Sequence, residues 1–286
     1  MKTSEILIIV VIYNCKIELS ESLQSLSRSI ELNANEKVDC LIYDNSSERQ
    51  DYIPLFRSIN ILHYEHDQSN GGVSRAYNFG ANYARELGKK WLLLVDQDTS
   101  FPEKAYGIID SVVCEQNGFL YAPVLMSANS SIIFSPSKLI LKRGFPVKVA
   151  PTGVISLKRF SPINSGLVIS LELFSKAGGY NERIKLDFSD FEFIDRLTNE
   201  TETLFVLPFV AFHDLSSAEK KSLSSACFRY SSYCTGALEY SRGKLKDMLI
   251  LGLVCFARQA TLCLKYRTTA FIDIFLQKYL RDAINR

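Results

Sequence analysis

Apolar runs alternate with helical patterns along the first hundred residues of the chain. Residues 6–13, 38–43 and 91–95 are continuous apolar runs of the length expected for strands that are buried on both faces. Between these runs, apolar residues recur at helical spacing over residues 19–30 and again over residues 73–87. Strands that alternate with helices in this way predict an α/β fold with a parallel sheet.

The second half of the chain shows a looser pattern. Short apolar runs between residues 101 and 161 predict antiparallel strands or loops, and the runs at 163–170 and 206–212 predict two further strands. Residues 186–197 alternate apolar with acidic side chains and lead into a helix. Beyond about residue 218, long apolar stretches mix with basic residues and predict helices. We therefore expect a main domain over 1–217 and a helical extension over 218–286.

Polar residues follow several of the predicted strands at the point where each one ends. Tyr13 ends the first run, Asp44 follows the second, and Asp96 and Asp98 follow the run that begins at Trp91. The carboxyl ends of parallel strands lie along one edge of a sheet, where open α/β sheets bind their ligands. We therefore expect these side chains to share one cleft, with Asp44 suited to a nucleoside base or ribose.

The Asp96-Gln97-Asp98 segment places two carboxylates one residue apart after a buried strand. Side chains two apart in a strand point to the same side, so the two charges repel each other unless a cation lies between them. A divalent ion shared with substrate phosphates would relieve this repulsion. An isolated Asp-x-Asp is more often a polar turn, so the metal hypothesis depends on the other residues near it.

Three other segments carry candidate chemistry. Gly71 precedes the 73–87 helix and Arg75 lies in its first turns, an arrangement that suits an anion, although a plain loop is the commoner reason for such glycines. Asp187, Asp190 and Glu192 lie among aromatic residues, and one of them would serve as a general base or simply favour a helix N-terminus. His213 ends a predicted strand, as a metal ligand or as a structural residue.

Composition sets the broader limits. With 47% apolar and 22% charged residues the chain is typical of a globular protein, and its net charge of +2 gives no reason to expect nucleic acid. The seven cysteines are scattered without a Cys-x-x-Cys pair and there are only three histidines, which predicts reduced cysteines in a cytoplasmic protein without a zinc site. The first apolar run is too short for the core of a signal peptide.

Taken together, these segments resemble the family-2 glycosyltransferases of the GT-A fold, and more closely their bacterial rhamnosyltransferase branch. The matching pieces keep the order and spacing of that family and lie at residues 11–14, 43–47, 70–80, 94–98, 164–166, 178–180, 186–192 and His213. Two positions depart from the pattern. Glu192 stands where many relatives have Asp, and Asp195 stands where relatives usually have an apolar or small residue.

The resemblance implies a nucleotide-sugar donor, a role for each matching residue and a divalent cation. Asp190 corresponds to the catalytic base, with Asp187 and Glu192 flanking it as alternatives. Asp98 and His213 would hold the metal, which suits Mn²⁺ or Mg²⁺. The implied substrate contacts are Tyr13, Asp44, Gly71, Arg75, Asp96, Asn164, Asp187 and Glu192.

The implied reaction is an inverting transfer of a sugar to a bacterial surface polysaccharide or a lipid-linked acceptor. L-Rhamnose from dTDP-rhamnose is the donor suggested by the branch, and galactofuranosyl, galactosyl and glucosyl donors are the alternatives. A nucleotidyltransferase would need a Gly-rich first loop, whereas this chain has Tyr13-Asn14-Cys15-Lys16. An inactive nucleotide-sugar-binding scaffold is disfavoured because Asp96, Asp98, Asp190 and His213 are all present.

The basic, apolar tail has two interpretations. Helices of this kind lie on an anionic membrane surface, here the cytoplasmic face of the inner membrane, or they pack on the catalytic domain or form a homodimer contact. Arg258 interrupts the longest apolar run, residues 248–256, before it reaches the length that spans a bilayer.

Overall fold

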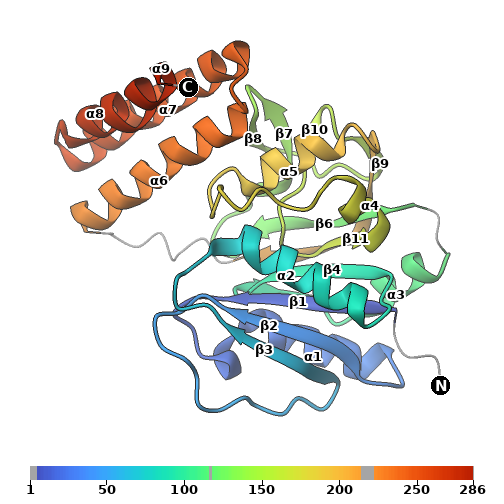
Figure 1. Ribbon diagram of the computed structural model, residues 1–286. Coiled ribbons are helices and arrows are strands. Elements are labelled where there is room, and N and C mark those ends of the chain that lie inside the picture. The colour runs from blue at the N-terminus through green and yellow to red at the C-terminus, as the bar shows by residue number, and fades with distance from the viewer. Residues whose placement is uncertain (1–4, 116–117, 214–221, 286) are drawn as a thin grey trace.

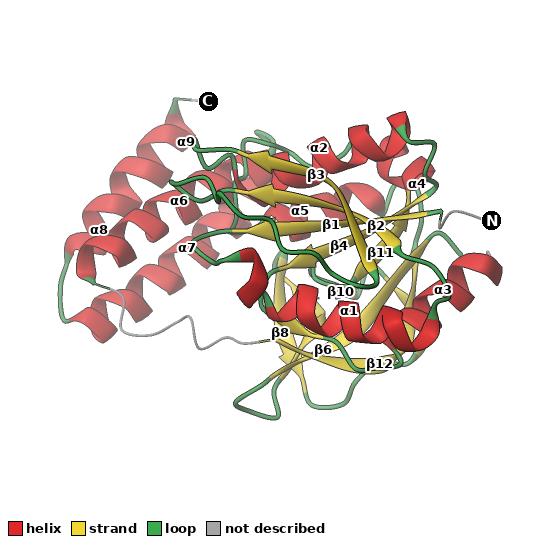
Figure 2. Cartoon of the chain, turned by 90° about the horizontal axis from the view of Figure 1, so that it is seen from below, coloured by secondary structure: helices red, strands yellow, loops and turns green. Residues whose placement is uncertain are grey.

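The computed structural model describes residues 5–115, 118–213 and 222–285. A mixed sheet of 12 strands in this part of the chain forms the centre, and helices cover both of its faces (Figures 1 and 2). The main strand order is β10-β7-β6-β11-β4-β1-β2-β3, and β12 pairs with β5, β6 and β9. The boundary expected between residues 217 and 218 lies outside the described residues.

The parallel half of the sheet agrees with the predicted strands. It contains β1 (Ile6–Ile12), β2 (Val38–Asp44), β3 (Ile59–His66) and β4 (Trp91–Asp96). β1 lies between β2 and β4, with Ile12 beside Asp44 and Val11 beside Asp96. The carboxyl ends of these strands therefore lie along one edge, as the sequence predicts.

The other half of the sheet is antiparallel apart from β12, which runs parallel to β6. This half explains the looser pattern of the sequence, because β5 and β10 have only two residues each and β8 and β9 contain no buried residue. Its members are β5 (Thr99–Ser100), β6 (Leu120–Ser127), β7 (Ile133–Ile140), β8 (Arg143–Val147), β9 (Gly153–Ser156), β10 (Phe160–Ser161), β11 (Leu167–Ser170) and β12 (Thr203–His213).

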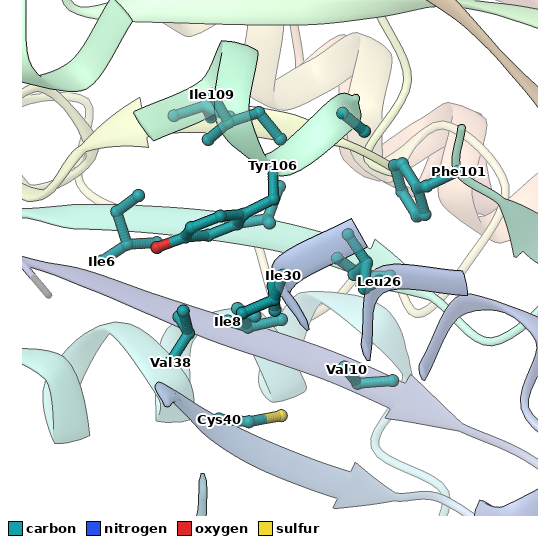
Figure 3. Packing of buried hydrophobic residues seen from close by; sticks show 14 of the residues in the cluster. Ile6, Ile8, Val10, Leu26, Ile30, Val38, Cys40, Phe101, Tyr106 and Ile109 are labelled. Carbon is teal, nitrogen blue, oxygen red and sulfur yellow. The ribbon is translucent and has the colours of Figure 1, made fainter. Parts of the chain in front are cut away.

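Two helical layers bury the two faces of the sheet. Alternate residues of β1, including Ile8 and Val10, pack against Leu26 and Ile30 of α1 and Tyr106 of α3 (Figure 3). The intervening residues of β1 pack against α2. The helices of the two layers, with one short 3₁₀ turn, are η1 (Ile17–Leu19), α1 (Glu21–Asn33), α2 (Gly72–Glu86), α3 (Ala105–Glu115), α4 (Leu171–Lys176) and α5 (Ser189–Leu197).

The helical extension packs against the α5 side of this core (Figure 1). It consists of α6 (Leu223–Ser241), α7 (Leu245–Tyr266), α8 (Ala270–Phe275), η3 (Leu276–Arg281) and α9 (Asp282–Ile284). Ile184 and Phe188, from the loop before α5, belong to the same buried cluster as the inner faces of these helices. The extension therefore shares its core with a loop of the main domain.

Helix α7 is longer than the interrupted apolar run suggested. It continues through Arg258, and within the described residues it is the one helix whose length and composition would suffice to cross a membrane. The Arg258 guanidinium lies 4.5 Å from the centre of the Tyr233 ring on α6, so this charge is accommodated by packing against a neighbouring helix.

The turn at Gly72 depends on the absence of a side chain, and this gives a first prediction. Gly72 has φ +85°, and a Cβ there would overlap the carbonyl of Lys185. We expect Gly72→Ala to lower the free energy of unfolding by about 3 kcal/mol or more, because backbone strain and overlap combine. Gly88→Ala is the matched control, since its φ is +67° but no atom lies within 4 Å. It should lose only about 1 kcal/mol in urea denaturation, and equal losses for the two variants would contradict the overlap.

Candidate active site

A cleft of about 510 Å³ opens at the carboxyl ends of the parallel strands. Side chains from β1, from the β4–β5 turn, from the segment before α5, from the end of β12 and from α6 line it. Five of the predicted site residues with acidic or imidazole side chains meet here: Asp96, Asp98, Asp187, Asp190 and His213. Tyr13 and Asn164 also line the cleft, so the structure brings together seven of the predicted residues.

Asp96 is the last residue of β4 and is held by the helix that covers the sheet. The Tyr77 hydroxyl of α2 donates a hydrogen bond of 2.8 Å to Asp96 Oδ1. Burial raises the pKa of Asp96, while His213 and the hydrogen bond from Tyr77 act in the opposite direction. Asp96 is thus fixed at the floor of the cleft by a neutral donor.

Asp98 lies in the turn after β4 and faces His213 across the cleft. Asp98 Oδ1 is 3.4 Å from His213 Nδ1, and the Thr99 hydroxyl lies 2.8 Å from the same nitrogen. The short strand β5 pairs with the end of β12 and so fixes the two segments relative to each other. The pairing of β5 with β12 therefore brings Asp98 and His213, which are more than a hundred positions apart in the sequence, within hydrogen-bond range.

The Asp98 and His213 pair would suit a divalent cation once the lone pair of His213 Nδ1 turns from the Thr99 hydroxyl to the ion. Two ligand atoms about 2.1 Å from one ion and at right angles to each other lie about 3.0 Å apart, close to the observed separation. Among the described residues no cluster of three or more His, Cys, Asp or Glu side chains gathers at one point. Water or substrate oxygens would therefore complete the coordination of an ion held by this pair.

Asp190 stands in the first turn of α5 and faces the cleft. Phe188 precedes the helix in a left-handed conformation, with φ 76°, which turns the chain sharply before Asp190. Burial raises the pKa of Asp190 to about 7, and hydrogen bonds from the backbone amides of Phe191 and Asp190 itself oppose this rise. The charges of Asp96 and Asp187 add to it. A carboxylate of this kind can accept a proton near neutral pH.

Arg229 is a site residue that the sequence interpretation did not select. It lies on α6 in the helical extension, lines the cleft, and places its Nε 3.5 Å from Asp187 Oδ2. It is the one Lys or Arg among the described lining residues. In the sequence it is one of many basic residues in the tail, so only its tertiary position distinguishes it.

Tyr13 and Asn164 line the cleft, and each is held by hydrogen bonds to another residue of the protein. The Gln97 side chain bridges the end of β1, accepting from the Tyr13 amide at 2.7 Å and donating to the Tyr13 carbonyl. Asn164 Oδ1 accepts from the hydroxyl of Tyr180 at 2.7 Å. The Tyr13 side chain is half exposed, so its ring is available to a ligand.

Asp44 has the predicted position at the strand edge, but its carboxylate is enclosed. It is fully buried and accepts hydrogen bonds from the Tyr64 hydroxyl, the Gln50 side chain and the Ser46 amide. Gln50 also lines a second cavity, of about 460 Å³, between the loops at 14–18 and 46–52. A ligand in that cavity would meet Gln50 first, and direct contact with Asp44 would require Gln50 or Tyr64 to move.

The predicted anion site at the start of α2 differs from the expectation. The amides of Gly71 and Gly72 donate to Asp67 Oδ2 and Asn45 Oδ1, at 2.9 and 3.3 Å, and that of Val73 donates to the Lys185 carbonyl. Arg75 pairs with Asp67 at 3.4 Å and with Glu182 at 3.6 Å, away from the cleft. Gly71 and Arg75 therefore serve the fold of this loop, and neither of them lines the cleft.

Glu192 is also placed away from the cleft. Its two carboxylate oxygens accept from Arg196 at 2.8 and 2.9 Å, and only 1% of the residue is exposed. Arg196 in turn donates to the carbonyls of Ala177 and Gly179. The structure therefore corrects the expectation of a substrate contact at Glu192 and leaves Asp187 and Asp190 as the cleft-lining candidates for the base. Asp195, the other departure from the family pattern, pairs with Lys142 and Arg242.

Comparison with solved structures defines the class of the fold. S. aureus TarS 1-349 in complex with UDP-GlcNAc superposes with a TM-score of 0.58 at 15% identity, covering 96% of this chain and 81% of that one. GalNAc-T7 with UDP, GalNAc and Mn²⁺ superposes with a TM-score of 0.56 at 12% identity, covering 100% and 58%. At these identities the likeness shows the fold alone, and that fold is the GT-A type.

Sequence comparison adds the family. The profile of glycosyl transferase family 2 matches residues 7–109, from β1 into α3. The dTDP-rhamnosyl transferase RfbF of Shigella flexneri is 26% identical over 140 residues, which cover 49% of this chain and 47% of the relative. The match thus spans about half the length of that curated relative. Residues 7–109 therefore match glycosyl transferase family 2, in agreement with the resemblance expected from the motifs.

The surroundings of Asp190 give a second prediction, which needs no substrate. We expect the Asp190 carboxyl to titrate near pH 7, about three pH units above a free aspartate, because it is buried beside other carboxylates. Carbon-13 NMR of aspartate-labelled protein measures this directly, with Asp190→Asn assigning the resonance. Asp96→Asn should lower the pKa of Asp190 only partly, since burial is the larger cause. Titration of Asp190 near pH 4 would contradict its burial.

Proposed function

We propose that this protein is an inverting glycosyltransferase that uses a nucleotide-sugar donor and a divalent cation. The observation that carries the proposal is the convergence, in one cleft, of the Asp98 and His213 pair with Asp190, a carboxyl whose pKa lies near 7. A transfer reaction needs both functions at once: a positive charge beside the leaving group, which gains negative charge as it departs, and a base for the acceptor hydroxyl. The family-2 domain supports the same assignment.

The proposed roles follow from position. Asp98 and His213 would hold Mn²⁺ or Mg²⁺, which when bound supplies Lewis-acid stabilisation of the charge on the departing diphosphate. Asp190 accepts the proton of the acceptor hydroxyl as that oxygen attacks the anomeric carbon from the side opposite the leaving group. Arg229 contributes a fixed positive charge to the diphosphate, in bidentate hydrogen bonds that its planar guanidinium favours.

We propose dTDP-L-rhamnose as the donor and a saccharide or lipid-linked saccharide of a bacterial surface polysaccharide, such as O-antigen or capsule, as the acceptor. The support is the similarity to the dTDP-rhamnosyl transferase of Shigella flexneri. The donor alternative is a UDP-sugar, since the TarS and GalNAc-T7 structures hold UDP or UDP-GlcNAc. The acceptor would approach Asp190 from the open side of the cleft, beside Leu186 and Phe191.

Replacement of the proposed base gives the third prediction. Asp190→Asn should lower kcat by about 10²- to 10⁴-fold, the range that general bases supply, while donor affinity stays within about twofold. In the unmodified protein kcat should rise with pH to a plateau above pH 7, because only the ionised carboxylate accepts a proton. Asp187→Asn should keep this rise in kcat with pH, whereas unchanged turnover in Asp190→Asn would remove Asp190 as the base.

Donor recognition gives the fourth prediction. A thermal-shift panel of dTDP, UDP, dTDP-rhamnose and UDP-sugars, with and without Mn²⁺, should single out dTDP-rhamnose, because a ligand that binds only the folded protein raises its melting temperature. Preference for UDP-sugars would reassign the donor and leave the reaction unchanged. A panel in which no nucleotide stabilises the protein would contradict the donor site itself.

Single-residue variants separate the contributions of the metal and of Arg229 to nucleotide binding. Asp98→Ala should abolish the part of the stabilisation that depends on Mn²⁺. Arg229→Gln should weaken nucleotide diphosphate binding by about 10- to 100-fold, the value of one or two charge-assisted hydrogen bonds. Arg183→Gln is the matched control, because Arg183 is exposed and pairs with Glu239 outside the cleft, and it should leave the affinity unchanged.

A further inference from the structure

Helix α7 has one face that is fully engaged with the rest of the protein. Leu251, Val254 and Cys255 are buried in the cluster that α6 and α8 share, and the Tyr230 hydroxyl of α6 donates to the Cys255 carbonyl at 2.9 Å. The Arg258 side chain also turns toward α6. Figure 1 shows α6 between the α7–α8 pair and the main domain.

The opposite face of α7 is apolar along the whole helix and exposed. Residues at intervals of three or four positions lie on one side of an α-helix, and on this side of α7 they are Leu245, Leu249, Leu253, Phe256, Ala260 and Leu264. Leu249 and Leu253 are each 64% exposed and Leu264 is 81% exposed. Between Leu249 and Leu264 this face carries no charged side chain.

The neighbouring helical segment, α8 to α9, extends the same surface. Its exposed apolar residues recur every fourth position at Ile272, Leu276, Leu280 and Ile284. The two helical segments are in contact beside these rows, where the Phe256 ring of α7 packs edge-on against the buried Phe275 of α8, with centroids 6.0 Å apart. Because the buried residues of both helices face α6, the two rows lie together on the outer side of the pair. We call these ten residues the outer apolar face.

Cations accompany this face and outnumber the acidic groups. Six exposed basic residues lie in α7 to η3 or at the helix ends, namely Lys244, Lys246, Lys265, Arg267, Lys278 and Arg281. The exposed carboxylates of the same segment are Asp273 and Asp282, since Asp247 is paired with Lys142 at 3.2 Å. An apolar face beside an excess of basic residues is the composition of helices that lie in the headgroup region of anionic bilayers.

We propose that the outer apolar face docks this protein on an anionic lipid surface, with α7 and α8 lying in the plane of the membrane. A spanning orientation of α7 would require its engaged face to leave α6, at the expense of the buried cluster and the packing of Arg258. A self-associating face would bring the cations of two copies together. An anionic lipid surface would bury the outer apolar face and also attract the basic residues beside it. This inference does not depend on the proposed reaction.

Vesicle flotation of the full chain tests the proposal. The protein should float with vesicles of phosphatidylglycerol and phosphatidylcholine in equal parts, and far less with phosphatidylcholine alone or in high salt, because the cations add about 1 kcal/mol each near an anionic surface. Leu249→Glu/Leu253→Glu should reduce the bound fraction at least about tenfold, since two carboxylates would enter the headgroup region. Circular dichroism and the melting temperature establish that the variant is folded.

The matched control carries two Leu-to-Glu changes on the main domain. Leu32→Glu/Leu55→Glu alters residues that are 63% and 95% exposed but lie away from the extension, and it should float as the unmodified protein does. Failure of the unmodified protein to float, or equal flotation of both double variants, would overturn the proposal. So would a concentration-dependent dimer that Leu249→Glu/Leu253→Glu dissolves without any change in flotation. Resistance of the bound protein to alkaline extraction would also overturn it, in favour of a spanning α7.

Discussion

The burial of carboxylates in one cleft is the constraint on which the arrangement of this site depends. Burial and proximity both disfavour the ionised forms, so each charge needs a compensating partner or must accept a raised pKa. Three of the four carboxylates that line the cleft have a partner from a different element: Tyr77 of α2 for Asp96, His213 of β12 for Asp98, and Arg229 of α6 for Asp187. The fourth, Asp190, has backbone amides alone and keeps a pKa near 7.

The same constraint makes the helical extension part of the site. The backbone of α6 approaches the loop before α5 so closely that a Cβ on Gly236 would lie 2.8 Å from the Asp187 carbonyl oxygen. Phe188, which turns the chain before Asp190, packs against Tyr233 with ring centroids 4.5 Å apart. Arg242, just after α6, pairs with Asp195 of α5 at 2.8 Å. Contacts of α6 therefore fix the position from which Asp190 faces the cleft.

The features that the sequence predicted correctly are those with a local signature. The buried strands are continuous apolar runs in the sequence, and the Asp96 and Asp98 pair follows such a run. The parallel sheet and the polar edge at its carboxyl ends could therefore be predicted without tertiary information. Asp190 was identified because the family motif around it is contiguous. The cleft-lining position of these three residues agrees with that inference.

Glu192 and Arg75 were expected to contact substrate, but the structure pairs each of them with other charged side chains of the protein. Glu192 looks like an active-site acid in its motif, but Arg196, one helical turn later, takes both of its oxygens. Arg75 has the right spacing for a phosphate contact, yet Asp67 and Glu182 hold it elsewhere. Arg229, in contrast, lines the cleft only because α6 packs beside the loop before α5. The sequence around Arg229 gives no sign of this packing.

The positions of Gly71 and Arg75 change which groups could bind the negative charge of a diphosphate. Helix N-termini attract anions through free amides, but the amides of Gly71, Gly72 and Val73 are all bonded within the protein. With Arg75 also engaged, the fixed positive charge at the described walls of the cleft is that of Arg229, beside the pair that fits a divalent ion. Charge compensation at this site thus depends on the helical extension, and the face by which that extension would meet lipid lies on the helices packed directly against α6. The proposed lipid-docking face and the charge compensation of the cleft therefore depend on the same set of packed helices, α6 to α9.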